Sequence, residues 1–227
     1  MALTVSQSGT ATGASTTPTA SINITEAANQ TLVVLLGVDD TVVQSASFTY
    51  DSVAVSEAAV STGTGQYVWV GILKNPNSGS SLSLSGTIAN NRTWGLIWLV
   101  LTDNDQTTAH DSGTIQISES ASATTSGVTV TSETNDLVIS FINVNNKAAT
   151  TVTPSGTGQT SITELTPGEN ACALEATYTA GDTSITTAWS WSGAAAKTEI
   201  ALNFNLTSGG GGGSPYKPRR AALLGVG

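Results

Sequence analysis

An almost continuous apolar run at residues 93–102 predicts a β-strand that is buried on both faces. The run contains two tryptophans, and only Gly95 interrupts its large apolar side chains. Turn-forming residues flank it at 90–91 and 103–105. It is too short to span a bilayer, which takes about 20 apolar residues. Its aromatic and β-branched content favours a strand over a helix, so we expect it to be the central strand of a two-layer β domain.

Other segments follow one of two strand patterns. Residues 31–38 and 66–73 are apolar almost throughout and predict two more buried strands, and residues 137–142 predict another. The remaining segments alternate apolar and polar residues with a period of two, which is typical of strands with one buried face. These segments are residues 21–24, 82–84, 128–130, 172–178, 185–191 and 200–206. Residues 48–55 alternate in the same way on both sides of Asp51 and Ser52, which predicts a tight hairpin.

The spacing of these segments predicts an all-β protein of about ten to twelve short strands. Turns rich in Gly, Asn and Asp separate them, and no stretch of useful length has a helical period. Short strands at regular intervals favour a sandwich or a barrel. We predict a two-sheet, jelly-roll-like sandwich over residues 1–206.

The strand pattern stops after Leu206, where an extended C-terminal tail is expected. Residues 207–214 contain five consecutive glycines and have the composition of a flexible linker, either natural or engineered. Residues 215–227 combine basic and apolar side chains, and we predict that they anchor the domain to an assembly. Basic side chains would pair with carboxylates of a partner, and the others would fill apolar pockets. The candidate partner-binding residues are Tyr216, Lys217, Arg219, Arg220, Leu223, Leu224 and Val226.

The charge distribution is uneven along the chain. All sixteen acidic residues precede residue 209, where only four basic residues oppose them, so the formal charge of the body is about −12. The tail carries three basic residues and no acidic one. An acidic body argues against a nucleic-acid partner, because affinity for phosphates comes from basic side chains. The basic tail indicates an acidic protein surface instead.

The cysteine content and the N-terminus bear on the cellular compartment. Cys172 is the only cysteine, which excludes an internal disulfide, and we expect it to be a buried apolar residue. The first residues have neither a basic nor an apolar signal region. We therefore expect synthesis in the cytoplasm and no membrane partner.

Two short motifs carry candidate chemistry. His110 and Asp111 are adjacent, but no nucleophile-elbow motif supplies the serine of a catalytic triad, so we predict no enzymatic activity. Residues 103–105 resemble the start of a calcium loop, but the glycine and closing glutamate of that motif are missing. A solvated turn is the preferred interpretation, and we predict neither a metal nor a cofactor.

The five tryptophans fall into two groups. Trp69, Trp94 and Trp98 lie in apolar segments and are expected in the core. Trp189 and Trp191 share one face of an otherwise polar segment. Core packing is the favoured interpretation of this pair, and an aromatic platform for a glycan is the alternative.

The order of the segments resembles that of the jelly-roll-like β sandwiches of tailed-phage virion proteins and some bacterial surface proteins. The segments that carry the resemblance are residues 32–40, 48–51, 67–76, 81–86, 93–105 and 135–139. It implies a non-enzymatic building block, often oligomeric, on the surface of a particle. Without a signal region, a virion protein made in the host cytoplasm is favoured over a bacterial surface protein.

Two functions therefore compete. The first is a virion structural protein that decorates or cements a capsid, with other virion proteins and copies of itself as partners in a homo-oligomeric arrangement. The second is a carbohydrate-binding or adhesive module, such as a fibre component.

Overall fold

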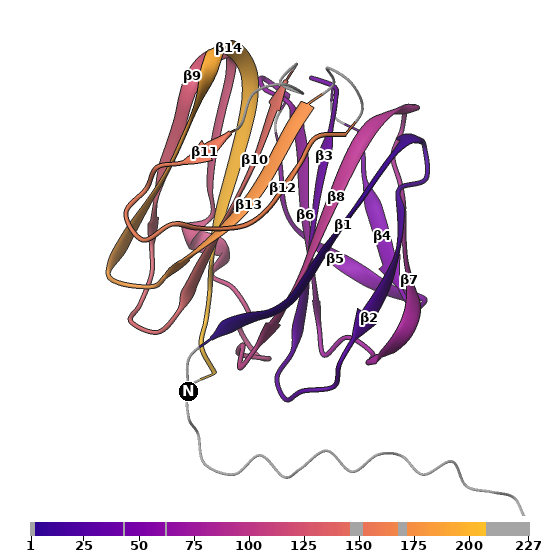
Figure 1. Ribbon diagram of the computed structural model, residues 1–227. Helices are drawn as coiled ribbons and strands as arrows, with labels where there is room; N and C mark the ends of the chain where they lie inside the picture. Colours follow the sequence, from indigo (N-terminus) through magenta and orange to yellow (C-terminus); the bar gives the residue numbers. More distant parts are fainter. Residues whose placement is uncertain (1–2, 43, 62, 146–151, 168–171, 208–227) are drawn as a thin grey trace, which may run out of the picture.

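Fourteen β-strands and one short 3₁₀ helix form the described part of the chain (Figure 1). The structure is a computed structural model that describes residues 3–42, 44–61, 63–145, 152–167 and 172–207. The first eight strands are β1 (Thr4–Ser15), β2 (Thr19–Ile24), β3 (Thr31–Val38), β4 (Ser47–Tyr50), β5 (Val53–Val60), β6 (Tyr67–Lys74), β7 (Gly79–Thr87) and β8 (Arg92–Thr102). They are followed by the helix η1 (Ser112–Thr114), then β9 (Gln116–Thr131), β10 (Leu137–Asn145), β11 (Thr153–Pro154), β12 (Thr160–Leu165), β13 (Cys172–Ala180) and β14 (Ser184–Phe204).

The first eight strands make one curled antiparallel sheet in the order β1-β8-β3-β6-β5-β4-β7-β2. The sheet is close to a barrel, because its two edge strands are consecutive in the chain and approach one another. The side chain of Gln7 on β1 accepts a hydrogen bond from the backbone N–H of Thr25, just after β2, at 3.3 Å. A side chain therefore spans the seam between the two edges, where no backbone ladder joins β1 to β2.

The second sheet has the order β11-β14-β10-β13-β12, with β9 paired to β14. The β9–β14 pair is a long ribbon whose register breaks between Ser190 and Ala195, beside Gly193 with a φ of 69°. Figure 1 shows the ribbon turning over at the top of the molecule. The part, or limb, of β14 after this break pairs with β10 in the sheet, and the limb before the break lies over the outer face of that sheet.

Strands β3, β6 and β8 are buried on both faces, because they lie between two cores. Val34, Leu36 and Leu96 face the interior of the curled sheet. Val33 and Ile97, on the opposite face, pack against the second sheet. The continuous apolar runs in these strands follow from this middle position, so the prediction of doubly buried strands is confirmed.

Gly95, which interrupts the central run, lies directly opposite Gly37 on β3. Leu174 from the second sheet occupies the space above this pair, and a Cβ at either glycine would overlap its side chain. The two glycines therefore form a recess in the first sheet that receives one leucine of the second.

The all-β class and the two antiparallel sheets agree with the sequence prediction, but two details differ from it. The part of the chain that the structure describes has fourteen strands where ten to twelve were expected. Residues 185–191 and 200–206 were predicted as separate strands, and residues 184–204 instead form the single strand β14. Ser192 and Gly193 are the turn formers between the two segments, and β9 pairs with both limbs.

Candidate functional site

The two ends of the described chain lie together at one end of the body. At the start of β1, the hydroxyl of Thr4 is 2.9 Å from that of Thr102 at the end of β8. One residue further on, the backbone oxygen of Asp103 accepts a hydrogen bond from the N–H of Thr207 at 2.8 Å. We call this region, made of Thr4, residues 102–111 and residues 203–207, the exit end.

Carboxylate and amide side chains fix the last strand at the exit end. Asn203 Nδ2 donates to Asp136 Oδ2 at 2.8 Å and to Asn205 Oδ1 at 2.9 Å. Asn205 Nδ2 donates in turn to Asp111 Oδ1 at 2.9 Å. The backbone N–H of Leu206 donates to Asp136 Oδ1 at 2.8 Å. This network holds the chain in place up to the point where the tail begins.

Asn104 ties the same region to the first sheet. Its side chain is fully buried, and its Nδ2 donates to the backbone oxygens of Ala109 and Asn205, each at 2.8 Å. Its Oδ1 accepts the hydroxyl hydrogen of Thr31 on β3 at 2.5 Å. The position from which the tail departs is therefore determined by contacts to both sheets.

The residues considered for calcium binding or catalysis belong to this framework. Asp105 Oδ1 accepts the backbone N–H groups of Thr107 and Thr108, at 2.6 and 2.9 Å, and so closes a turn after β8. This is the turn that the sequence favoured. His110 packs 6.3 Å from the ring of Phe204, and burial lowers the pKa of its imidazole. In the described ranges, no group of three or more His, Cys, Asp or Glu side chains is arranged to hold a metal ion.

Trp189 and Trp191 lie in the core under the folded β9–β14 ribbon. They are 1% and 7% exposed and pack with Ile142 and Val144 of β10. Their indole N–H groups donate to Glu199 Oε1 at 2.9 Å and to the backbone oxygen of Ala123 at 3.0 Å. Core packing, the favoured interpretation, describes both residues, and neither presents a ring face on which a glycan could stack. Trp69 and Trp94 are also buried, whereas Trp98 is half-buried at the edge of the inner core.

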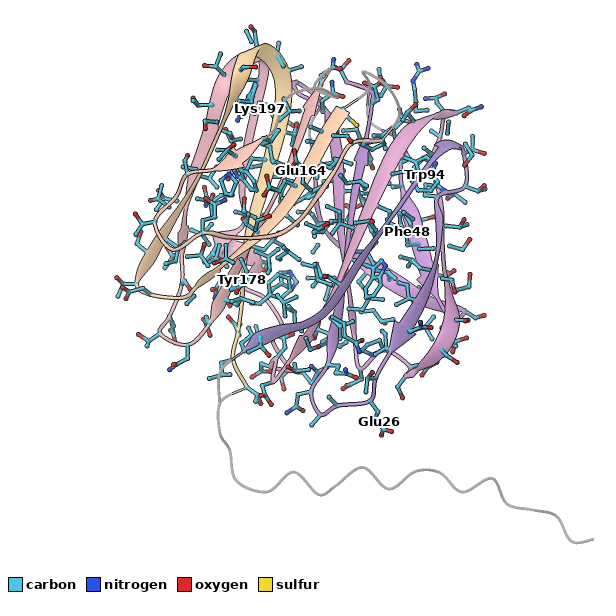
Figure 2. The ribbon with its side chains drawn as sticks, in the orientation of Figure 1. Glu26, Phe48, Trp94, Glu164, Tyr178 and Lys197 are labelled. Carbon is cyan, nitrogen blue, oxygen red and sulfur yellow. The ribbon has the colours of Figure 1, made fainter. Side chains whose placement is uncertain are left out.

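Glu199 and Lys197 form a buried polar network between the two limbs of the ribbon. Four donors reach the Glu199 carboxylate: Ser126, Ser140, Thr187 and Trp189. Lys197 Nζ donates to Ser126 Oγ at 2.7 Å, so this hydroxyl bridges the two charges. Burial lowers the pKa of Lys197, and the nearby Glu199 opposes that shift. Lys197 is labelled in Figure 2, near the folded end of the ribbon.

Sequence reasoning missed this network. The alternation placed Glu199 on the face opposite Ile200 and Leu202, which is correct. The alternating pattern does not indicate, however, that another layer of the protein covers that face. The covering limb belongs to the same strand, and only the fold at residues 191–194 brings it there.

A pair of carboxylates lies across strands β12 and β13. Glu164 and Glu175 are register partners, which places both side chains on the outer face of the sheet. Glu175 is 2% exposed, and its Oε2 has no hydrogen-bond partner among the described residues. Burial raises the pKa of Glu175 to about 7, the hydrogen bond from Ser161 opposes the shift, and the charge of Glu164 adds to it. Like charges directly opposite one another are unfavourable in a sheet.

Because of this pair, we expect the folded protein to lose stability as the pH rises from about 4.5 to about 7. In that range the folded protein keeps a proton on Glu175 that the unfolded chain, with an ordinary pKa of 4.5, releases. The free energy of unfolding therefore falls as the pH rises. Glu175→Gln should flatten this dependence and make the protein more stable than the wild type at pH 8. Urea unfolding at several pH values measures the effect.

The control for this prediction is Glu26→Gln, because Glu26 is exposed. That variant should keep the pH dependence of the wild type. An unchanged slope in Glu175→Gln would show that the Glu175 carboxyl does not carry the effect.

A shallow groove of about 520 Å³ lies between the loop after β11 and the start of β14. Its lining mixes polar and apolar groups and carries hydroxyl groups and one carboxylate. The residues are Ser155, Gly156, Thr157, Asp182, Ser184, Ile185, Thr186 and Ala188. Groups of this kind can exchange hydrogen bonds with the hydroxyls of a sugar.

The predicted anchoring residues Tyr216, Lys217, Arg219, Arg220, Leu223, Leu224 and Val226 lie outside the described residues. Their role stays a prediction, and the structure describes only the place from which the tail departs.

Comparison with known proteins found no matching family model, no matching curated protein and no matching solved structure. Within the described ranges, no helix is long and apolar enough to cross a membrane. The resemblance to phage virion sandwiches thus stays a prediction.

Proposed function

We propose that this chain is a non-enzymatic structural protein of a virion, which decorates or cements a capsid and is held there by residues 215–227. The main support for this proposal is the arrangement of the chain at the exit end. The described chain starts and stops at one end of the body, where side chains from both sheets fix the last strand. A peptide that docks from this end attaches the body by one end and leaves the remaining surface directed outward.

The charges support the same attachment. The tail has three basic residues and the body has a formal charge of about −12, so an acidic protein surface fits the peptide. The 19 residues from Gly209 onward could reach about 60 Å when extended, at about 3.3 Å per residue. A neighbouring copy of this chain is therefore within range, as are other virion proteins. We propose a homo-oligomeric arrangement on the particle.

We also propose that residues 4–102 form a jelly roll. Its eight strands include the antiparallel pairs β1–β8, β2–β7, β3–β6 and β4–β5. Such nested pairs result when one long antiparallel double strand rolls up. Jelly rolls occur in viral capsid proteins and in lectins, so this fold supports both candidate functions and does not choose between them.

Truncation after Ser208 tests the anchoring role. The truncated body is expected to stay folded and soluble, because the last strand and the network around Asn203 end before Ser208. It should fail to incorporate into particles. A matched control replaces the five glycines with serines and keeps residues 215–227, and this variant should incorporate normally. Normal incorporation of the truncated chain would contradict the proposal.

A carbohydrate-binding function is the second candidate, and the hydroxyl-bearing groove beside β14 is the observation that favours it. Among the described residues that line this groove, Asp182 is the only charged one, and its side chain is exposed. If the groove binds a glycan, Asp182→Ala should lower binding on a glycan array while incorporation into particles is unchanged. No binding by the wild-type protein would remove this candidate.

A further inference from the structure

Three buried polar residues lie close to one another between the two sheets, far from the exit end. Gln66 precedes β6, Asn143 lies on β10 and Thr198 on β14. Gln66 is 1% exposed, and the other two are completely buried. Four of their atoms have no hydrogen-bond partner among the described residues: Gln66 Oε1 and Nε2, Asn143 Oδ1 and Thr198 Oγ1.

Several contacts place these residues in one cluster. Asn143 and Thr198 are register partners, on the face of the second sheet that packs against the first. Asn143 Nδ2 donates at 3.1 Å to the backbone oxygen of Tyr67, the neighbour of Gln66. On the other side of Gln66, a Cβ at Gly65 would overlap the hydroxyl of Thr198. Gln66 thus lies between one residue that contacts Asn143 and another that contacts Thr198.

The free atoms determine what can bind there. Asn143 Nδ2 already donates to the backbone oxygens of Val38 and Tyr67, so its Oδ1 is left as an acceptor that needs a donor. Gln66 Nε2 is a donor that needs an acceptor. A metal cation could bind the oxygens but could not accept the hydrogen bond of Gln66 Nε2. A water molecule both donates and accepts, and it typically makes two to four hydrogen bonds when buried.

We propose that Gln66, Asn143 and Thr198 form a site for ordered water between the two sheets. Buried polar groups in folded proteins almost always have a partner, and leaving one without a partner is costly. A bridging water stabilises nearly as well as a direct hydrogen bond. Water then adds to the direct hydrogen bonds that Asn143 makes across the two sheets at this place, whereas apolar side chains such as Leu174 fill most of the remaining contact.

The sign of the stability change in Gln66→Met tests the proposal. Methionine has a similar shape but offers no amide. If water binds at the site, the substitution removes partners from that water, and the melting temperature should fall by about 2–4 °C. If the site is dry, the substitution removes unpaired polar atoms and the melting temperature should rise. A rise or no change overturns the proposal.

A matched control is Gln44→Met, because Gln44 is fully buried but its amide is satisfied. It donates to Asp40 Oδ2 at 2.8 Å and accepts from the backbone N–H of Asn90 at 3.1 Å. Its substitution should lower the melting temperature whether or not the Gln66 site holds water, and it gives the scale for a glutamine with partners.

A crystal structure of the unmodified protein gives a readout that is independent of stability. Density for water within hydrogen-bonding distance of Asn143 Oδ1 and the Gln66 amide supports the proposal. A direct hydrogen bond between these two side chains, with no water between them, overturns it. So does a cation coordinated by their oxygens.

Discussion

Glu199→Gln is expected to destabilise the protein by about 3–5 kcal/mol, although the two side chains have nearly the same size. The carboxylate is fully buried and accepts hydrogen bonds from Ser140, Thr187, Trp189 and Ser126. Removing its charge takes from the buried Lys197 the carboxylate that acts on it most strongly and leaves only the weaker effect of Glu119. Losing one partner of a buried charge pair typically costs this much. Urea unfolding at pH 7, followed by tryptophan fluorescence, measures the change in the free energy of unfolding.

The double variant Glu199→Gln/Lys197→Met separates the charge effect from simple packing. Removing both charges should cost less than the sum of the single substitutions, because neither charge is then left alone. Glu26→Gln is the control and should change stability by less than about 0.5 kcal/mol, since Glu26 is exposed. Strictly additive losses would show that the two charges are not coupled.

Leu174→Ala is expected to cost about 2–5 kcal/mol, the usual range for a buried leucine. Leu174 is completely buried, and it fills the recess formed by Gly37 and Gly95. Gly95→Ala acts from the opposite side, because the added methyl group would overlap Leu174 and Pro167. Overpacking of this kind costs about 1–3 kcal/mol. Chemical denaturation of each variant gives the two values.

Combining Gly95→Ala with Leu174→Val tests whether the two residues fit one another. The shorter side chain makes room for the new methyl group, so the pair should be more stable than the sum of the single effects predicts. Gly113→Ala is a suitable control, because a Cβ there meets nothing within 4 Å. If the pair shows no coupling, Leu174 does not hold the two sheets together through this recess.

Much of the fold could be predicted from the sequence, because burial leaves a local trace. Val33 and Val34 are adjacent and both apolar, which is favourable only for a strand between two cores. The sequence also shows that Gly95 interrupts an apolar run. It does not show why a glycine is needed there, because Leu174, which fills the space above it, lies 79 positions away in the chain. The pairing order of the strands was hidden for the same reason, since alternation defines faces and not neighbours.

In the candidate sites, too, the sequence predicts the features that local residues determine and misses those that depend on residues distant in the chain. The turn at residues 103–105 follows from local side chains, and the sequence predicted it. Trp189 and Trp191 were correctly placed on one face, but their cover depends on a fold in β14 that alternation does not signal. The roles of Asn203 and Asn205 depend on Asp136 and Asp111, which reach them only through strand pairing. The raised pKa of Glu175 likewise depends on its cross-strand partner Glu164.

The number of copies of this chain in purified particles tests the proposed function most directly. Quantitative mass spectrometry can compare the chain with the major capsid protein in particles made by the genome that encodes both. A protein that decorates or cements a capsid is expected in numbers comparable to those of the capsid protein. A few copies per particle would indicate a fibre component, and absence from particles would contradict a virion role altogether.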